Sequence, residues 1–460
     1  MRILFATAEL APFVKVGGLA DASAGLVHAL RIHGLEVDVV LPDYGDLPFD
    51  GDTRHRLDVP AWAGDVFVRR GRLGNFPSVM LVSHESLTRS NPYVDSDGAG
   101  WSDNDHRFFV FSAAIAALAE TSQSDILHLN DWHTAVALGF DGSDTPSVLT
   151  IHNLAYQGIS SADWLELIPR SPEAFRLNGQ TNPLAGGIVQ SDRVVTVSPT
   201  FAREVVHSKG GFGLEDVLVE KGRAFTGILN GIETDVWDPA ADPYLPSVYG
   251  IESNSTREMN RKLLAEDMGW DDTNAPVIGM VTRLTDQKGV DIALQVASSL
   301  PDLDARMVIL GSGDRDLADA AIELAERLPD HLAVRLGYDE ALSHRIFGGS
   351  DLYLMPSRFE PGGLTQMQAM RYGSIPIVTD VGGLHDTVID ADLDPDSGNG
   401  FVAAEVDVAS VADAVSRACL AWRSEERRRE LVRRGMSRDW SWATAAQQYI
   451  DIYREITQAP

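Results

Sequence analysis

The residues best suited to chemistry in this 460-residue chain lie in Pro356-Ser-Arg-Phe-Glu-Pro-Gly-Gly-Leu-Thr-Gln366. The apolar run Asp351–Met355 before them predicts a buried strand, and the Pro-Gly-Gly triplet predicts a turn with a helix starting near Leu364. Backbone N–H groups at such a helix start lack partners and attract anions. A carboxylate does not suit phosphate, so Glu360 is better placed to accept hydrogen bonds from sugar hydroxyls. A capping loop with a solvated glutamate is the alternative for this motif alone.

Two further turns carry basic residues that suit phosphate. The buried strand predicted at Pro276–Val281 is followed by a turn with Arg283 and Lys288, a pair able to neutralise a diphosphate. Lys15 precedes Gly17-Gly18 after the first predicted strand, where an ammonium group can lie beside phosphate. Taken singly, each turn also fits surface charges and structural glycines.

Polar clusters follow two more predicted strands, Asp125–Leu129 and Ser147–Ile151. Asp131 and His133 lie in the first cluster and His152 in the second. The carboxyl ends of parallel strands share one edge of a sheet, so we expect these side chains to converge at a functional site. A lone histidine is more often a core or capping residue. The spacing matches no common zinc motif, so we expect no metal and no cofactor.

The elements that must position these residues alternate between strand and helix. Arg2–Ala8, a helix ending at Gly34 and Glu36–Leu41 open the chain as a βαβ unit, which predicts a doubly wound parallel sheet. The alternation restarts at Pro276, so we predict two Rossmann-like α/β domains. Gly311-Ser-Gly313 lacks the third glycine of a dinucleotide fingerprint, which disfavours a dehydrogenase.

The predicted domain boundaries follow from this alternation. Residues 1–240 form an N-terminal domain, and 241–255, rich in Pro, Asp and Ser, form a linker. Residues 256–438 form the second domain. Residues 439–460 contain an amphipathic helix expected to pack back on the first.

Composition narrows the function classes. A net charge of −29 argues against nucleic acid and anionic membrane surfaces, because both favour basic patches. The apolar runs are too short to span a membrane, and the chain starts with a predicted strand and not a signal peptide. The single cysteine, Cys419, leaves no internal disulfide and fits a buried thiol. We expect a cytoplasmic protein with a neutral substrate.

Taken together, the motifs closely resemble those of the bacterial glycogen synthase and plant starch synthase family, over about Ile3 to Tyr453. The first loop is similar to the family's Lys-Thr-Gly-Gly-Leu-Ala-Asp. The matching segments are Lys15–Asp21, Asn130–His133, His152–Gly158, Asn230–Ile232 with Trp237, Arg283–Gly289, Glu360–Gln366, Gly382–Leu384 with Asp386-Thr387, and Trp440–Trp442.

The resemblance implies a GT-B fold, in which two Rossmann-like doubly wound domains face each other across a cleft. It also implies a retaining transfer of glucose from a nucleoside diphosphate sugar to the non-reducing 4-OH of an α-1,4-glucan. The donor is typically ADP-glucose in bacteria, and UDP-glucose is the other candidate. By resemblance, Arg283 and Lys288 stabilise the leaving diphosphate and Glu360 holds the glucose hydroxyls. His152 lies near the reacting centre.

The resemblance also implies the substrate-binding residues. Those expected at the donor are Lys15, Gly18, Tyr338, Gly363, Leu364 and Thr365, with Tyr338 at the base. Asp21 and Asp131 match positions on the acceptor side, and Asn153 and Asn230 lie in matching motifs.

The chain departs from the family pattern at two positions. Val16 replaces the usual threonine, and Gly362 stands where many bacterial members have cysteine. Val16 can change donor or acceptor preference, whereas the proposed chemistry does not need a cysteine. Two alternatives stay open: a GT-B enzyme with another nucleotide sugar or a small-sugar acceptor, and a non-catalytic glucan- or nucleotide-binding scaffold. The oligomeric state does not follow from the sequence.

Overall fold

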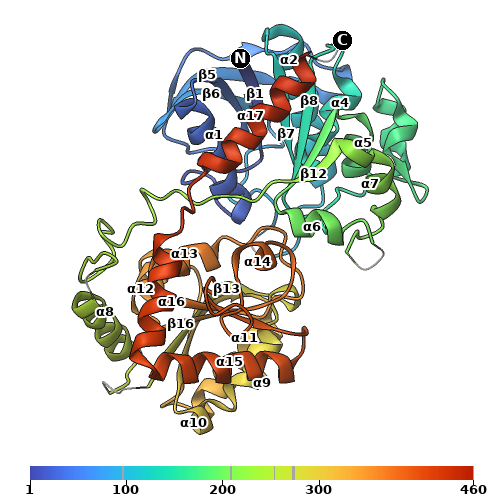
Figure 1. The fold of residues 1–460 in the computed structure, drawn as a ribbon. Helices are drawn as coiled ribbons and strands as arrows, with labels where there is room; N and C mark the ends of the chain where they lie inside the picture. Colours follow the sequence, from blue (N-terminus) through green and yellow to red (C-terminus); the bar gives the residue numbers. More distant parts are fainter. Residues whose placement is uncertain (96–97, 208–209, 253, 272–274, 459–460) are drawn as a thin grey trace. The chain divides into compact units, whose positions relative to one another are not determined.

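The structure is a computed structural model that describes residues 1–95, 98–207, 210–252, 254–271 and 275–458. The chain divides into two compact units. Unit 1 contains Met1–Gly231 and Trp442–Pro460, and unit 2 contains Ile232–Ser441. Each unit contains a mainly parallel sheet with helices packed against it (Figure 1).

The sheet of unit 1 has the strand order β12-β11-β8-β7-β1-β2-β6-β5-β3, with β4 paired to β5. Every pairing from β12 to β6 is parallel, whereas β5 runs antiparallel to its neighbours. The strands are β1 Arg2–Ala6, β2 Glu36–Pro42, β3 Phe49–Gly51, β4 His55–Arg56, β5 Phe67–Leu73, β6 Phe76–Ser83, β7 Ile126–Asn130, β8 Ser147–Ile151, β11 Arg193–Thr196 and β12 Phe225–Gly227, with a separate hairpin of β9 Arg176–Leu177 and β10 Gln180–Thr181.

The strand order of unit 1 reverses between β1 and β7, because β1 is followed in sequence by β2 on its other side. The loops after β1 and β7 therefore leave the same edge of the sheet at a topological switch point, where ligands of such sheets bind. The helices of unit 1 are α1 Gly18–Ile32, α2 Asn104–Thr121, α3 Trp132–Ala135, α4 Ala137–Phe140, α5 Pro183–Gln190, α6 Pro199–Glu204, α7 Glu215–Lys221 and α17 Ala443–Gln458, with 3₁₀ turns at Ala61–Ala63, Ala162–Leu167, Pro172–Phe175 and Gly222–Ala224.

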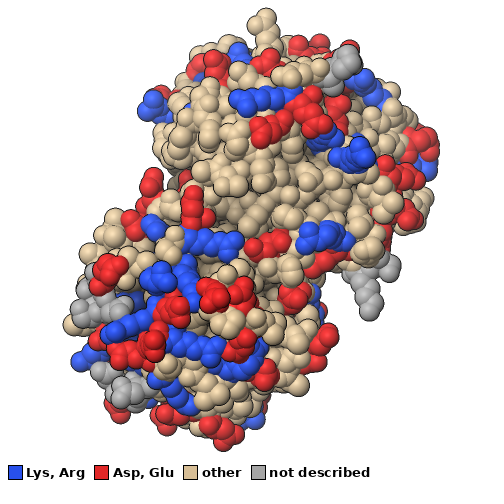
Figure 2. All heavy atoms as spheres, in the orientation of Figure 1, with Lys and Arg blue, Asp and Glu red and all other residues tan. Residues whose placement is uncertain are grey.

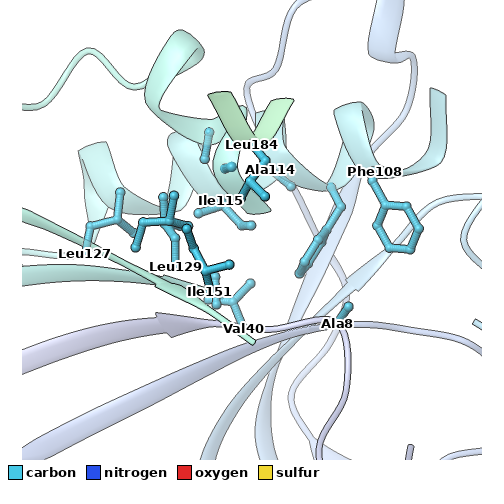
Figure 3. Packing of buried hydrophobic residues seen from close by; sticks show 14 of the residues in the cluster. Ala8, Val40, Phe108, Ala114, Ile115, Leu127, Leu129, Ile151 and Leu184 are labelled. Carbon is cyan, nitrogen blue, oxygen red and sulfur yellow. The ribbon is translucent and has the colours of Figure 1, made fainter. Parts of the chain in front are cut away.

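One face of this sheet is covered by α2, whose residues Phe108–Leu118 are mostly apolar and buried. A strand that is buried on both faces reads as a continuous apolar run, as the sequence predicts for β7 and β8. Figure 3 shows how side chains from α2, the strands and α5 pack together, including Val40, Phe108, Ala114, Ile115, Leu127, Leu129, Ile151 and Leu184.

The other face of the unit 1 sheet is covered by α1 and by the C-terminal helix α17, which lie side by side (Figure 1). A Cβ on Gly25 of α1 would lie 2.0 Å from Nε1 of Trp442, so only glycine allows this close approach. The buried ring of His128 lies between Tyr453, whose hydroxyl is 2.6 Å from Nδ1, and Thr150, 2.8 Å from Nε2. Helix α17 is thus part of the core of unit 1.

The sheet of unit 2 has the order β15-β14-β13-β16-β17-β18, and all its pairings are parallel. Its switch point lies between β13 and β16. The strands are β13 Val277–Leu284, β14 Arg306–Gly313, β15 Leu332–Leu336, β16 Leu352–Met355, β17 Ile375–Thr379 and β18 Phe401–Ala403. The helices are α8 Asn254–Asp267, α9 Val290–Ala297, α10 Leu300–Leu303, α11 Arg315–Arg327, α12 Glu340–Gly349, α13 Thr365–Arg371, α14 Gly382–Thr387, α15 Val408–Arg423 and α16 Glu425–Ser437, with a 3₁₀ turn at Asp286–Lys288.

The division between the units differs from the one we predict from composition. It lies between Gly231 and Ile232, and the segment 241–255, predicted as a linker, belongs to unit 2. Leu245 and Tyr249 are buried there in a core cluster, and the Tyr249 hydroxyl donates to the Tyr372 carbonyl at 2.7 Å. Tertiary contacts fix this segment although its sequence has no helix or strand period. Trp442 onward belongs to unit 1.

The charge of the surface and the environment of Cys419 can be compared with what the composition predicts. On the face in Figure 2, basic and acidic side chains intermingle over unit 2 and form no single basic patch. Cys419 on α15 is a buried free thiol, and burial raises its pKa to about 11. Among the described residues, no helix has both the length and the apolar character needed to cross a membrane.

Replacing Tyr453 by phenylalanine should destabilise unit 1. The variant leaves the buried Nδ1 of His128 without its 2.6 Å partner, so we expect the free energy of unfolding to fall by about 1–3 kcal/mol. Urea unfolding of Tyr453→Phe against wild type measures this. Tyr156→Phe, at a tyrosine with 57% exposure, is the control and should unfold like wild type. Identical curves for all three proteins would contradict the role of this contact.

Candidate active site

Two loops of unit 2 meet at its switch point, one after β13 and one after β16. Gly289, at the end of the first loop, has φ +63°, and a Cβ there would lie 1.9 Å from the carbonyl oxygen of Pro356 in the second. The backbone N–H of Arg358 donates to the carbonyl of Gln287 at 2.8 Å, and the side-chain amide of Gln287 donates to the carbonyl of Phe359 at 3.2 Å. The chain therefore holds these two loops together through backbone contacts.

At the junction of the two loops, Lys288 and Glu360 form an ion pair. The Lys288 ammonium donates to Oε2 of Glu360 at 2.6 Å, and the Ser357 hydroxyl donates to the same oxygen at 3.0 Å. Glu360 is 5% exposed, so its carboxylate is largely removed from water. The two groups predicted to bind diphosphate and sugar are thus direct neighbours, on adjacent loops.

Arg358 orients the Glu360 loop from its outer side. Its guanidinium makes a two-pronged contact with Asp291 at the start of α9, at 2.7 and 2.8 Å, and also donates to the carbonyl of Asp286. The Asp291 carboxylate in turn raises the pKa of Arg358. Two parallel N–H···O bonds fix direction as well as distance. The sequence shows Arg358 in the loop but gives no sign of this partner.

The remaining predicted donor residues of unit 2 lie on its loops. Gly363 has φ +62°, as its turn requires, and Leu364 caps α13, which starts at Thr365 as predicted. The Thr365 hydroxyl contacts Sδ of Met355 at 3.2 Å. Arg283 is exposed and donates to the Gln287 side chain at 3.4 Å. Tyr338 follows β15 and is 73% exposed, so its ring is accessible to solvent.

In unit 1, Asp131 ties the end of β7 to the loop after β8. It is 6% exposed and has φ +55°, a left-handed conformation that is costly for a residue other than glycine. Its Oδ1 accepts the N–H of His152 at 2.7 Å and that of Asn153 at 3.4 Å. Burial raises the pKa of Asp131 to about 7, although these two N–H groups lower it. The predicted convergence of Asp131 and His152 is therefore present.

The His152 ring is fixed by Asn130, a residue of the quoted motif that the sequence does not single out. Nε2 of His152 lies 2.9 Å from Oδ1 of Asn130, whose side-chain amide donates to the carbonyl of Ala6 at 2.9 Å. Because a carbonyl oxygen only accepts, Nε2 carries the proton. Burial lowers the pKa of His152 to about 3, so the ring is neutral at ordinary pH. The signal for Asn130 was its place at a strand end directly before Asp131.

His133 does not join this group. Its ring packs among Trp132, Tyr93 and Phe108, with centroid distances of 4.4, 5.0 and 4.6 Å, and burial lowers its pKa to about 3. It is a core residue, the ordinary alternative for a lone histidine. Across the described residues, no group of three or more His, Cys, Asp or Glu side chains is arranged to hold a metal ion.

The first loop of unit 1 holds Lys15 by an ion pair. The ammonium group donates to Oδ1 of Asp21 on α1 at 2.8 Å, and both side chains are partly exposed. Gly18 begins α1. Asn230 follows β12 and is 7% exposed. It is not hydrogen-bonded to Asp131 or His152. Asp21 thus contacts a donor-side residue directly, whatever its relation to an acceptor.

The sequence matches families over most of its length. Residues 2–220 match the starch synthase catalytic domain family, and residues 269–437 match the family of glycosyl transferases group 1. The glycogen synthase of Dechloromonas aromatica is 39% identical over 477 residues, covering 99% of this chain and 98% of that protein. The glycogen synthase of Halorhodospira halophila is 40% identical, covering 99% of each chain. This chain belongs to the glycogen and starch synthase family.

Solved structures agree with this family and its fold. The catalytic domain of starch synthase IV from Arabidopsis thaliana, bound to ADP and acarbose, aligns with a TM-score of 0.90 at 35% identity, covering 100% of this chain and 99% of that one. Sucrose-phosphate synthase from Thermosynechococcus elongatus aligns with a TM-score of 0.66 at 18% identity, which bears on the fold alone. The chain has the GT-B fold and is a glycosyltransferase of the glycogen and starch synthase type.

Asp131 should give the enzyme an acid limb in its pH profile. As pH falls through about 7, the carboxylate takes up a proton and becomes a weaker acceptor for the N–H groups of His152 and Asn153, so kcat/KM should fall. Because the pKa of Asp131 is raised in the folded state, its protonated form stabilises the fold at low pH, and this contribution is lost as pH rises through about 7. The effect of pH on stability is therefore opposite to its effect on activity.

The comparison that checks this limb is kcat/KM from pH 5.5 to about 8.5 for wild type and Asp131→Asn. The asparagine side chain does not titrate, so the variant should be less active and lack the limb. His152, with a pKa of about 3, does not contribute in this range. An unchanged limb in Asp131→Asn would show that another group titrates.

Proposed function

We propose that this enzyme transfers glucose from ADP-glucose to the non-reducing 4-OH of an α-1,4-glucan and retains the anomeric configuration. The observation that carries the proposal is the contact of Lys288 with Glu360 at the switch point of unit 2. It places a cation for phosphate and an acceptor for sugar hydroxyls side by side, as a nucleoside diphosphate sugar requires. Relatives that are glycogen synthases, and a related structure that holds ADP and acarbose, support the same donor and acceptor classes.

The donor end of the proposed reaction is assigned mainly to unit 2. Arg283 and Lys288 stabilise charge on the departing diphosphate, which is where negative charge develops. Glu360 accepts hydrogen bonds from glucose hydroxyls. The backbone amides of Gly363 and Leu364 and the hydroxyl of Thr365 bind sugar and phosphate, and Tyr338 contacts the base. Lys15 and Gly18 of unit 1 are also assigned to the donor.

In the proposed transfer, the acceptor 4-OH attacks C1 of glucose on the face from which the diphosphate leaves. The C1–O bond to phosphate breaks with its electron pair on the leaving oxygen, a new C1–O bond forms, and the departing phosphate takes the hydroxyl proton. This scheme needs no covalent enzyme nucleophile, and the two-carboxylate arrangement of glycosidases is not part of it. Neutral His152, oriented through Nε2–H by Asn130, is assigned to the sugar beside the reacting carbon.

The other parts of the proposal rest on the family and the sequence. Asp21, Asp131, Asn153 and Asn230 are assigned to substrate binding, with Asp131 acting through the His152 loop that it holds. No metal or other cofactor takes part, and the protein works in the cytoplasm. UDP-glucose is the second candidate donor, since no described contact distinguishes the two bases.

The proposed donor and acceptor can be tested by nucleoside diphosphate release. Release from ADP-glucose should depend on added glycogen and exceed release from UDP-glucose. Glycogen-dependent release from UDP-glucose alone would change the donor and keep the chemistry. Slow release that is indifferent to glycogen would contradict the glucan acceptor.

Replacing Glu360 by alanine should lower kcat at least about tenfold, because each 1.4 kcal/mol of lost transition-state contact is tenfold in rate. The fold should survive, since the hydrogen bonds of this side chain are to Lys288 and Ser357 at the junction of the two loops. Steady-state rates with ADP-glucose and glycogen measure the effect. Glu405→Ala, at an exposed glutamate of the same unit, is the control. Unaltered turnover in Glu360→Ala would refute the role of this loop.

A further inference from the structure

Glu9 is a buried carboxylate in the first loop of unit 1 with no role in the chemistry above. It is 3% exposed and follows β1 at the switch point. Its Oε2 accepts the N–H of Val16 at 2.7 Å and that of Gly17 at 3.0 Å, and its Oε1 accepts the hydroxyl of Tyr93 at 2.7 Å. Both oxygens are therefore used, and the side chain spans the inside of the loop that carries Lys15.

The cost of burying this carboxylate indicates that the loop depends on it. Burial raises the pKa of Glu9, while the N–H groups of Val16 and Gly17 and the Tyr93 hydroxyl act to lower it. A buried charge is tolerated where it is hydrogen-bonded, and an apolar side chain would leave two backbone N–H groups without partners. Val16 itself is 42% exposed, so apolar packing of its side chain does not hold the loop in place.

The partner of Oε1 is itself firmly held. The Tyr93 ring packs on His133 and Phe108, with centroid distances of 5.0 and 6.2 Å. Arg107 of α2 is fully buried and donates to the carbonyls of Ser86 and Pro92 at 2.8 and 2.9 Å, which fixes the segment that leads into Tyr93. A rigid support thus reaches the first loop through one hydroxyl.

We propose that Glu9 is a positioning residue for the donor: it fixes the backbone of Val16 and Gly17, so that Lys15 and the start of α1 are held in the conformation that meets the diphosphate. Asp21 completes the arrangement, because it holds the Lys15 ammonium from α1 at 2.8 Å. The inference rests on the proposed function for the identity of the ligand. It assigns the loop geometry to a side chain that does not itself touch substrate.

The test uses three variants of the full-length enzyme. Glu9→Ala removes all three contacts. Glu9→Gln keeps them, because its carbonyl oxygen accepts both N–H groups and its amide donates to the Tyr93 oxygen. Tyr93→Phe removes only the hydroxyl. Glu36→Ala, at an exposed glutamate of the same unit, is the control.

We expect Glu9→Ala to raise the KM for ADP-glucose about tenfold or more, because this is the effect of losing one charge-assisted hydrogen bond. The change in kcat should be smaller, and the KM for glycogen should not change. Tyr93→Phe should raise the donor KM less, and Glu9→Gln should stay within about threefold of wild type. A residue that only stabilises the fold would lower the active fraction, and hence kcat, and leave the donor KM unchanged. That result would overturn the proposal.

Hydrogen exchange gives a measurement that does not depend on turnover. The amides of Val16 and Gly17 should exchange faster in Glu9→Ala and at the wild-type rate in Glu9→Gln, while Ile126–Asn130 of β7 stays protected in both. If wild type fails to use ADP-glucose, the proposed function fails, and exchange together with ADP binding still tests Glu9. Unchanged exchange in Glu9→Ala, or faster exchange with unchanged ADP affinity, would contradict the positioning role.

Discussion

The ion pair between Lys288 and Glu360 is the constraint on which the proposed donor site of this enzyme depends. The two charges lie 2.6 Å apart, on loops that Gly289 and Arg358 bring into backbone contact. Taking charges out of water is costly unless they are paired and hydrogen-bonded, so each group holds the other in place. The proposed substrate offers both a better partner, phosphate for the lysine and hydroxyls for the glutamate. Binding is then an exchange of partners at a site that is already formed.

In unit 1, the loops beside the sheet are held by hydrogen bonds between buried carboxylates and backbone N–H groups. Loops that leave a parallel sheet at its carboxyl edge carry N–H groups that the strands no longer satisfy. Asp131 accepts two of them from the loop after β8, and Glu9 accepts two from the loop after β1. Each carboxylate is buried, and the pKa of each is raised by that burial. The conformation of these loops is thus fixed by buried carboxylates whose desolvation is unfavourable, which fits a site that must hold one conformation.

The sequence predicted the fold and indicated which strand ends carry candidate site residues, because both follow from local patterns. The alternation of apolar strands and amphipathic helices predicted two Rossmann-like halves, and the motifs predicted the family. What it missed depends on contacts between distant segments. The segment predicted as a linker, 241–255, packs on unit 2 through Leu245 and Tyr249. Its sequence has no helix or strand periodicity from which this packing could be predicted. Asn130 and Glu9 escaped notice because their importance lies in which N–H or ring nitrogen they reach, and His133 was given a polar role although aromatic neighbours enclose it.

The most direct test of the exchange of partners is a calorimetric titration of ADP into wild type and Glu360→Gln. ADP lacks the glucose that Glu360 is proposed to bind, so the carboxylate only competes for the Lys288 ammonium. The account predicts that ADP binds the variant several-fold more tightly than wild type, because removing the charge releases Lys288 for phosphate. Equal or weaker ADP binding in Glu360→Gln would contradict the account and would show that the ion pair supports the phosphate site as it stands.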